Sequence, residues 1–160
     1  MTPSGSAGVR EIDVPDAARS RSTLGRLDYA DCFLVAAGRA SPGTAEQWSR
    51  AVLEDAPPGT RRALHLGWGS LGLELGPEQS EGCVLGWEMR RNVPDEILLG
   101  AVSALGLQGE LLFQCVPDGL RYATFVRLDT PEARAAWART EPGHRQIVPK
   151  LLREAAQRRG

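Results

Sequence analysis

The chain has 160 residues, of which 42% are hydrophobic and 24% charged, and its formal net charge is −1 at pH 7. These values are ordinary for one globular domain with a substantial core. A net charge so near zero gives no field that favours nucleic acid or an anionic membrane, so we expect neither as a partner. Lys150 is the only lysine among 19 basic residues. Arginine, alanine and glycine are abundant, which is typical of a G+C-rich bacterial genome.

The three cysteines, Cys32, Cys83 and Cys115, are odd in number and widely spaced. A disulfide framework is therefore not expected, and a reduced compartment fits. No apolar run approaches the ~18–20 residues that a membrane helix needs, so we expect no membrane insertion. The start, "MTPSGSAGVREIDVP", lacks a basic stretch followed by an apolar one. These patterns favour a cytoplasmic protein without a signal peptide.

Three segments are expected along the chain. Residues 1–7 are small, polar and interrupted by Pro and Gly, as in a disordered tail. Residues 8–27 form an irregular lead-in, and residues 28–158 form a single domain. In "DYADCFLVAA", the large apolar residues Tyr29, Phe33 and Val35 stand at odd-numbered positions, as on one face of a strand. The second half of this stretch predicts the first strand.

Two helical segments are expected next. Thr44 and Gln47 form a capping box before an apolar face that includes Trp48 and Val52. Pro57–Pro58 end this helix. The stretch "TRRALHLGWGSLGLELG" suits a second, weaker helix, since glycines interrupt it. It contains the glycine spacing G-x-G-x-x-G, but no βαβ unit surrounds it, so we expect no nucleotide cofactor.

Four strand-like runs follow: "GCVLGWEMRR", "EILLGAVSAL", "LQGELLFQCV" and "LRYATFVRLD". Their links are short, which favours antiparallel neighbours. Alternation with period two predicts one covered face and one wet face. The residues expected to point toward the helices are Leu85, Trp87, Met89, Leu111, Phe113, Tyr122 and Thr124. Glu88 and Glu110 are expected on the solvent side as cross-strand partners.

The closing segment predicts terminal helices. Thr130 is a candidate N-cap and Pro131 the first helical residue. Pro142–Gly143 and Pro149 are expected to kink or break the helix, which places His144 at or near the start of a second piece. The whole order predicts an α+β domain in which helices cover one face of a curved antiparallel sheet.

The segments "DYADCF", "TAEQWSRAVLEDAPP", "LGWEM" and "ARAAWARTEPGHRQIVPKLLREAA" carry a resemblance over most of residues 28–156. The chain resembles the SRPBCC superfamily, which includes START, polyketide-cyclase and plant pathogenesis-related proteins. It is most similar to a small bacterial family of unknown function within or near that group. The resemblance implies a helix-grip fold, in which a curved sheet wraps around a C-terminal helix with a cavity between them. It implies no established catalytic set.

His144 and Arg145 are the first candidates for chemistry. His144 could act as a general acid or base, and the pair could anchor a carbonyl or carboxylate of a ligand. Alternatively, His144 caps a turn and Arg145 pairs with an acid. A helix start and the adjacent cation both favour a neutral imidazole. Tyr122 is the second candidate for proton transfer, and His65 has no obvious partner.

Asp28, Tyr29 and Asp31 stand just before or at the first strand. A carboxylate here could pair with an arginine of the terminal helix and so fasten the N-terminal segment to it. The alternative is a catalytic role. No two of the histidines and cysteines show the spacing of metal ligands, so no metal is expected.

The ligand-binding candidates are Trp87, Met89, Leu111, Phe113, Tyr122, Thr124 and Arg145. Together with the resemblance, these residues predict that the protein binds a small, largely apolar molecule between sheet and helix. One alternative is an enzyme of the cyclase, dehydratase or isomerase kind that uses the same pocket. A structural or partner-binding protein is the other alternative. The residues do not name the ligand or the oligomeric state.

Overall fold

The computed structural model describes residues 8–37, 43–117 and 119–159, and the expected tail at residues 1–7 lies outside them. Within these ranges the strands are β1 (Val9–Ile12), β2 (Tyr29–Ala36), β3 (Leu73–Glu74), β4 (Gln79–Ser80), β5 (Cys83–Val84), β6 (Trp87–Val93), β7 (Glu96–Ser103), β8 (Leu107–Val116) and β9 (Gly119–Leu128). The helices are α1 (Asp16–Arg19), α2 (Ala45–Leu53), α3 (Pro58–Ser70) and α4 (Pro131–Arg159). The α+β class predicted from the sequence is confirmed.

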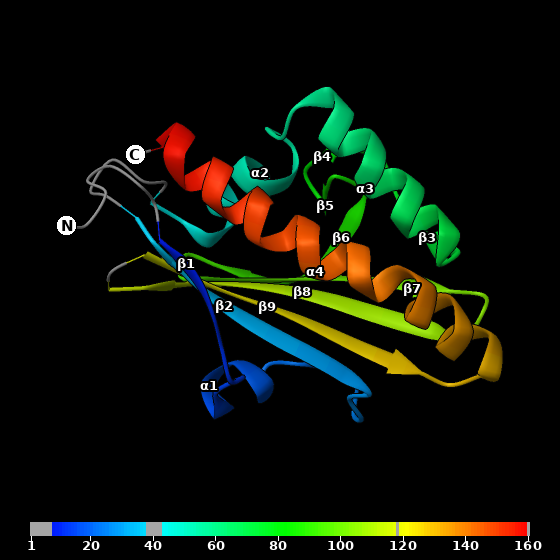
Figure 1. Ribbon diagram of the computed structural model, residues 1–160. Helices are drawn as coiled ribbons and strands as arrows, with labels where there is room; N and C mark the ends of the chain where they lie inside the picture. Colours follow the sequence, from blue (N-terminus) through cyan, green and yellow to red (C-terminus); the bar gives the residue numbers. More distant parts are fainter. Residues whose placement is uncertain (1–7, 38–42, 118, 160) are drawn as a thin grey trace.

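The described strands form one curved antiparallel sheet in the order β1-β2-β9-β8-β7-β6-β5-β4, with β3 paired beside β7. The antiparallel pairing expected from short links is confirmed for β6 to β9. Helices α2, α3 and α4 lie on one face of the sheet, whereas α1 lies on the other (Figure 1). The sheet is therefore covered by three helices on one face and in part by α1 on the other.

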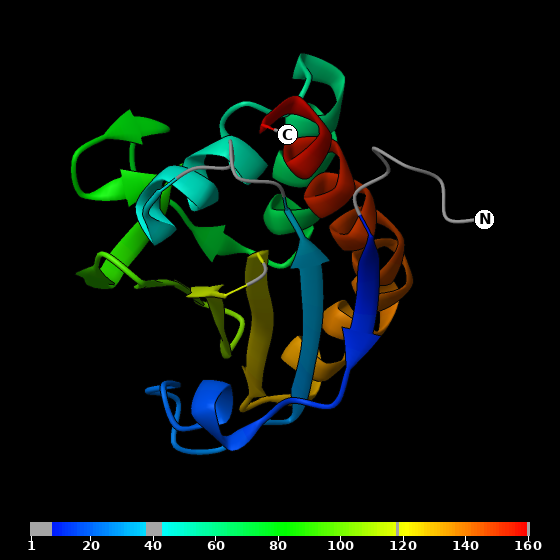
Figure 2. The same ribbon diagram turned by 90° about the vertical axis from the view of Figure 1, so that its left-hand side faces the viewer.

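The lead-in before residue 28 is more ordered than expected. Its first part, β1, adds a strand beside β2, and α1 follows on the outer face of the sheet (Figure 2). Ala18 and Leu24 bury their side chains there against Leu98, Leu112 and Phe125. The lead-in belongs to the fold, because it covers an apolar patch that the sheet would otherwise expose to water.

The prediction that Glu110 faces solvent is wrong. Its side chain is fully buried on the outer face. It accepts hydrogen bonds from the Ser22 hydroxyl at 2.7 Å, from the Thr23 backbone N–H and hydroxyl, and from Arg90 at 3.0 Å. These donors come from the lead-in and from β6, so Glu110 fastens the lead-in to the sheet. A buried carboxylate is tolerated where it is paired and hydrogen-bonded in this way.

The run "GCVLGWEMRR" is not one strand, as the sequence predicted, but a hairpin. Leu85 and Gly86 form the two-residue turn between β5 and β6, and both have positive φ, 46° and 91°. Two such residues are what a tight hairpin turn requires. A Cβ at position 86 would meet the Cβ of Leu75 at 3.0 Å, so glycine is needed here. Leu85 is nevertheless buried among the inward residues, as predicted.

Helix α2 begins as the sequence predicts. The Thr44 hydroxyl accepts the backbone N–H of Gln47, and the Gln47 side chain returns a bond to the Thr44 backbone. Helix α3 starts at Pro58 and contains residues 67–70, so the glycine-rich stretch is helical and does not follow a strand of a βαβ unit. The starts of these helices could be predicted from the sequence, because a helix cap depends on neighbouring residues alone.

The predicted break in the terminal helix is wrong. Helix α4 runs without interruption from Pro131 to Arg159, through Pro142 and Pro149 (Figure 1). Pro142 is exposed and Pro149 half-exposed. Because proline has no N–H, the carbonyl four residues before it loses its helical partner. On the solvent side this carbonyl bonds to water instead, so the helix can continue past the proline. His144 consequently lies inside α4, and the predicted helix-start environment does not exist.

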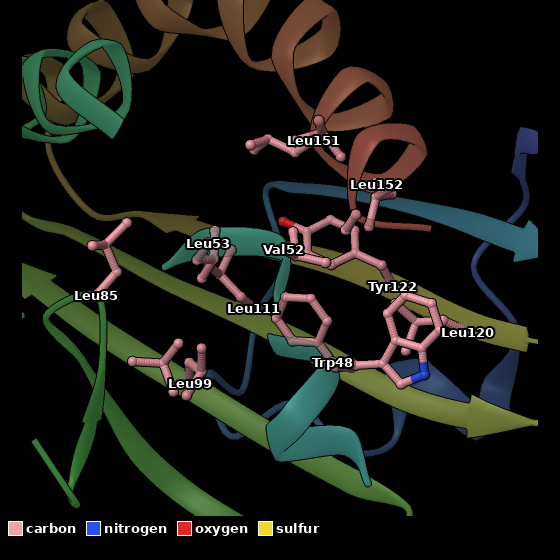
Figure 3. Close-up of a cluster of buried hydrophobic side chains, with 14 of the residues drawn as sticks. Trp48, Val52, Leu53, Leu85, Leu99, Leu111, Leu120, Tyr122, Leu151 and Leu152 are labelled. Carbon is pink, nitrogen blue, oxygen red and sulfur yellow. The ribbon is translucent and has the colours of Figure 1, made fainter. Parts of the chain in front are cut away.

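The main core lies between the sheet and the helices. Trp48 and Val52 of α2, Leu111 and Tyr122 of the sheet, and Leu152 of α4 meet there (Figure 3). A separate cluster gathers under the first turns of α4, around Trp137 and Ala133, with Leu107 and Val126 of the sheet. Helix α4 is thus held by two apolar clusters, one near each end.

Replacing Trp137 with Ala should lower the free energy of unfolding by about 3–5 kcal/mol, because its buried ring would leave a void. Urea denaturation followed by circular dichroism measures this change. Leu66→Ala is the control, since the Leu66 side chain is 70% exposed and its loss should change stability by less than about 0.5 kcal/mol. Equal midpoints for the two variants would contradict the core position of Trp137.

Candidate functional site: an apolar cavity under the terminal helix

A cavity of about 430 Å³ lies between the sheet and helices α3 and α4. Its floor is formed by β6, β8 and β9, with Trp87, Leu111 and Tyr122 among the lining residues. The volume falls within the ~300–1,000 Å³ of typical small-molecule pockets. Side chains therefore leave space for a ligand where the core would otherwise be closed.

The roof of the cavity is the middle of α4. Thr140, Gly143, His144 and Ile147 line it there, between the cluster around Trp137 and the cluster that includes Leu151. At the rim, the Ser70 and Thr140 hydroxyls approach to 3.4 Å across the gap between α3 and α4. The cavity exists because α4 is packed down at both sides of this span and carries small or polar residues within it.

Two tryptophans that line the cavity have indole N–H groups without a partner in the described part of the chain. The indole nitrogens of Trp87 and Trp137 are buried, and neither finds a hydrogen-bond partner within the described residues. Both residues line the cavity. A buried N–H without an acceptor costs about 1–3 kcal/mol, and such groups are uncommon in native proteins. A ligand oxygen would reach these donors only after a small shift of the indole rings, because both nitrogens are covered in this structure.

Tyr122 and Thr124 add a hydroxyl pair to the floor. Their oxygens are 2.7 Å apart, and both side chains are buried. Burial raises the pKa of Tyr122 far above its ordinary value, and the nearby Asp31 charge adds to the effect. The phenol therefore stays neutral and can donate or accept a hydrogen bond. This favours a binding role for Tyr122 over the removal of a proton from a substrate.

At one end of the cavity, His144 meets a buried carboxylate. Its Nε2 lies 2.8 Å from Oδ2 of Asp31, on β2. The Tyr29 hydroxyl donates to the same oxygen at 2.6 Å. The Asp31 side chain is 1% exposed and that of His144 14%. The other oxygen of Asp31, Oδ1, is buried and has no partner among the described residues.

The histidine ring is held between aromatic neighbours. The ring centroids of Trp137 and Tyr29 lie 5.4 and 5.8 Å from that of His144. Arg145 turns outward, where it stacks over the Tyr29 ring at 5.4 Å and pairs with Glu141 and Glu11. The imidazole therefore has a fixed orientation, with one edge toward Asp31.

The structure brings together only some of the residues that the sequence singled out. Trp87, Leu111, Tyr122, Thr124 and His144 line the cavity. Phe113 packs edge-on behind Tyr122 at 5.1 Å, and Met89 packs against the core, so neither borders the space. Arg145 lies outside it and pairs with acids, as one of the two interpretations held.

The pairing expected for the Asp28–Asp31 segment occurs, but its partner differs. Asp31 binds a histidine of α4 instead of an arginine. Asp28 pairs with Arg26 and accepts the Leu128 N–H. His65, which had no obvious partner, lies 2.6 Å from Glu78 on the surface. No sequence signal linked Asp31 to His144, because they are 113 positions apart.

Several lining residues were not assigned to a site from the sequence, among them three with a clear reason. Trp137 was expected in the core, and Trp68 and Gly67 fell in the ambiguous glycine-rich stretch. Across residues 8–37, 43–117 and 119–159, no three histidine, cysteine or acidic side chains gather as metal ligands would. In the same ranges, no helix has the length and apolar character to span a bilayer.

A comparison of the chain with protein-family models, curated proteins and solved structures finds no match. The cavity is therefore the feature of the molecule that points to a function.

Asp31→Ala should destabilise the protein by about 3 kcal/mol, because it leaves the buried donors of Tyr29 and His144 without an acceptor. Guanidinium denaturation of the purified variant gives the value. Glu88→Ala removes the same charge from an exposed position of β6 and serves as the control. If Asp31→Ala unfolds at the same midpoint as Glu88→Ala, the buried cluster does not hold α4 to β2.

Proposed function

We propose that the protein binds a small, largely apolar molecule with one or two oxygen acceptors in the cavity beneath α4. The observation that carries this proposal is a largely apolar cavity of about 430 Å³ whose lining includes Trp87 and Trp137, two residues with indole N–H groups unpaired among the described residues. A carbonyl or ether oxygen would satisfy them, whereas water in so apolar a space would lose many of its own hydrogen bonds.

The size of the cavity and the resemblance of the sequence to helix-grip proteins support the same proposal. An apolar ring system of one to three rings suits a volume of about 430 Å³. A cytoplasmic location in a bacterium is part of the proposal, and the three free cysteines of the chain suit a reduced compartment. The cavity size and the sequence resemblance both support the hypothesis of a helix-grip domain that binds such molecules.

The alternative of a partner-binding protein has less support. The exposed large hydrophobic side chains among the described residues are Leu66, Val93, Val102 and Leu105. They come from α3, from the end of β6, from β7 and from the turn after it. By contrast, the cavity offers both apolar area and specific donors in one place.

The most direct test is to incubate the purified protein with extract of a producing bacterium and to identify retained molecules by native mass spectrometry. We expect one class of small apolar oxygen-containing compounds, released on denaturation. Retention of only polar or charged compounds would contradict the proposal.

Filling the cavity should abolish that retention. An added Cβ at Gly67 meets no atom within 4 Å, so Gly67→Phe can place its ring in the open volume. Gly69→Phe is the matched control, because Gly69 is equally open, lies on the same helix and does not line the cavity. We expect Gly67→Phe to lower retention at least tenfold with no loss of thermal stability. Equal retention by both variants would place the ligand elsewhere.

A further inference from the structure

The buried cluster at the end of the cavity has a chemistry that binding alone does not use. We infer that Asp31 and His144 form a proton-transfer dyad that removes a hydrogen from the carbon next to a carbonyl group of a molecule in the cavity. This inference rests on the proposed binding function, and it adds an activity to it: isomerisation, or exchange of a carbon-bound hydrogen.

The hydrogen-bond pattern fixes which nitrogen of His144 is free. An ionised carboxylate only accepts hydrogen bonds, so the 2.8 Å contact with Asp31 places a hydrogen on Nε2. In the neutral ring, Nδ1 then carries a lone pair. Nδ1 makes no hydrogen bond to any described residue, while the His144 side chain lines the cavity. One ring edge is thus anchored, and the other is available to a bound molecule.

The surroundings favour the cation that would form during the reaction. When Nδ1 takes a proton, the ring becomes positive next to the Asp31 carboxylate, which is 1% exposed. A carboxylate behind a histidine base orients the ring and stabilises its charged form. Arg145 and Glu141 of α4 and Glu11 of β1 pair with one another, and Arg139 of α4 also lines the cavity. Asp31 is the charged group in direct contact with the ring, at 2.8 Å.

The hydroxyl of Tyr29 helps to hold the Asp31 carboxylate in place. It donates to Oδ2 of Asp31 at 2.6 Å, and burial and the Asp31 charge raise the pKa of Tyr29 well above its ordinary value. The phenol therefore remains a donor and does not compete for the proton. Tyr29 and Asp31 are positioning residues in this account, and His144 is the catalytic residue.

A hydrogen-bond donor for the developing negative charge belongs to Trp137, next to His144. The unpaired indole N–H of Trp137 belongs to a ring whose centroid is 5.4 Å from that of His144. In the proposed step, the C–H bond next to the carbonyl breaks and its proton moves to Nδ1. The electron pair forms the enolate, and the enolate oxygen accepts a hydrogen bond from an indole N–H. The proton on Nδ1 then returns to the same carbon or to a conjugated one, or is first replaced by one from solvent, which His144 contacts through its 14% exposed side chain. No oxidant or further reactant is needed.

The probe for this activity is 2-tetralone, a flat bicyclic ketone small enough for the cavity. In D₂O, proton NMR follows the replacement of the hydrogens next to its carbonyl by deuterium. We expect the wild-type protein to accelerate this exchange above the buffer rate. The C1 signal should fall to half as the monodeuterated ketone forms and then change only at the buffer rate, because a fixed base attacks one face. A fall of the C1 signal past half at the initial rate would overturn the inference.

His144→Gln tests the base directly. Glutamine can still donate to Asp31, but it cannot take up a proton near neutral pH, so exchange should fall by about 10²–10⁴-fold. The matched control is His65→Gln, because His65 also contacts an acid, Glu78 at 2.6 Å, but lies on the surface outside the cavity. Exchange by the control should equal that of the wild type. Undiminished exchange in His144→Gln would overturn the inference.

Binding is measured separately on the same samples, through saturation-transfer NMR of 2-tetralone. Binding by His144→Gln with loss of exchange supports the dyad. Binding by the wild type without exchange overturns the dyad and leaves the proposed binding function standing. Failure of the wild type to bind this ketone would overturn both.

The role of Asp31 has its own signature. In the wild type, the ¹⁵N signals of the His144 ring should show hydrogen on Nε2 and none on Nδ1, with the signals of His65 assigned from His65→Gln. Asp31→Asn should allow both tautomers and slow the exchange. Identical ring signals in Asp31→Asn and wild type would remove Asp31 from the mechanism.

Discussion

The structure depends on how one long helix covers a curved sheet. Helix α4 packs through two apolar clusters, around Trp137 at one side and around Leu151 and Leu152 at the other. The span between them cannot follow the sheet closely, since Gly143 and His144 fill little of the space below. The cavity is a consequence of this constraint. Its walls are rigid, because the residues at either side are close-packed core.

The same constraint explains the buried polar cluster. Over the cavity, the middle of α4 lacks apolar packing against the sheet. The hydrogen bond between His144 and Asp31 joins α4 to β2 there. A buried, hydrogen-bonded carboxylate is weak evidence for stability, because taking its charge from water is costly. The unpaired Oδ1 of Asp31 makes the arrangement still more costly. This cost is borne at the end of the cavity, where His144 is a lining residue.

The sequence predicted those features that depend on neighbouring residues. The capping box at Thr44, the start of α4 after Thr130, and strands β8 and β9 follow from caps and alternation. It did not predict that α4 is continuous. A proline signals a break, and whether the helix survives depends on which face the proline occupies, as Pro142 shows. Glu110 was misplaced for a similar reason, because its donors arrive from the lead-in, almost ninety positions away.

Much of the candidate site could be listed from the sequence, but its arrangement could not. Inward alternation identified Trp87, Leu111, Tyr122 and Thr124 as lining residues. The same alternation selected Phe113, which the structure places behind Tyr122. Pairing of Asp31 with His144 needs the sheet and the helix to be formed first. Whether tryptophan N–H groups find partners is likewise a property of the packed interior.

The central claim is that the indole N–H groups of Trp87 and Trp137 donate hydrogen bonds to an oxygen of a bound molecule. Proton–nitrogen NMR of the four tryptophan side chains tests it most directly, with and without an apolar ketone. The account predicts that the N–H signals of Trp87 and Trp137 move downfield on binding, as expected for new hydrogen bonds. The signal of Trp48, which lies in the core away from the cavity lining, should stay in place. Unmoved signals of Trp87 and Trp137 in the ketone-bound protein would contradict the claim.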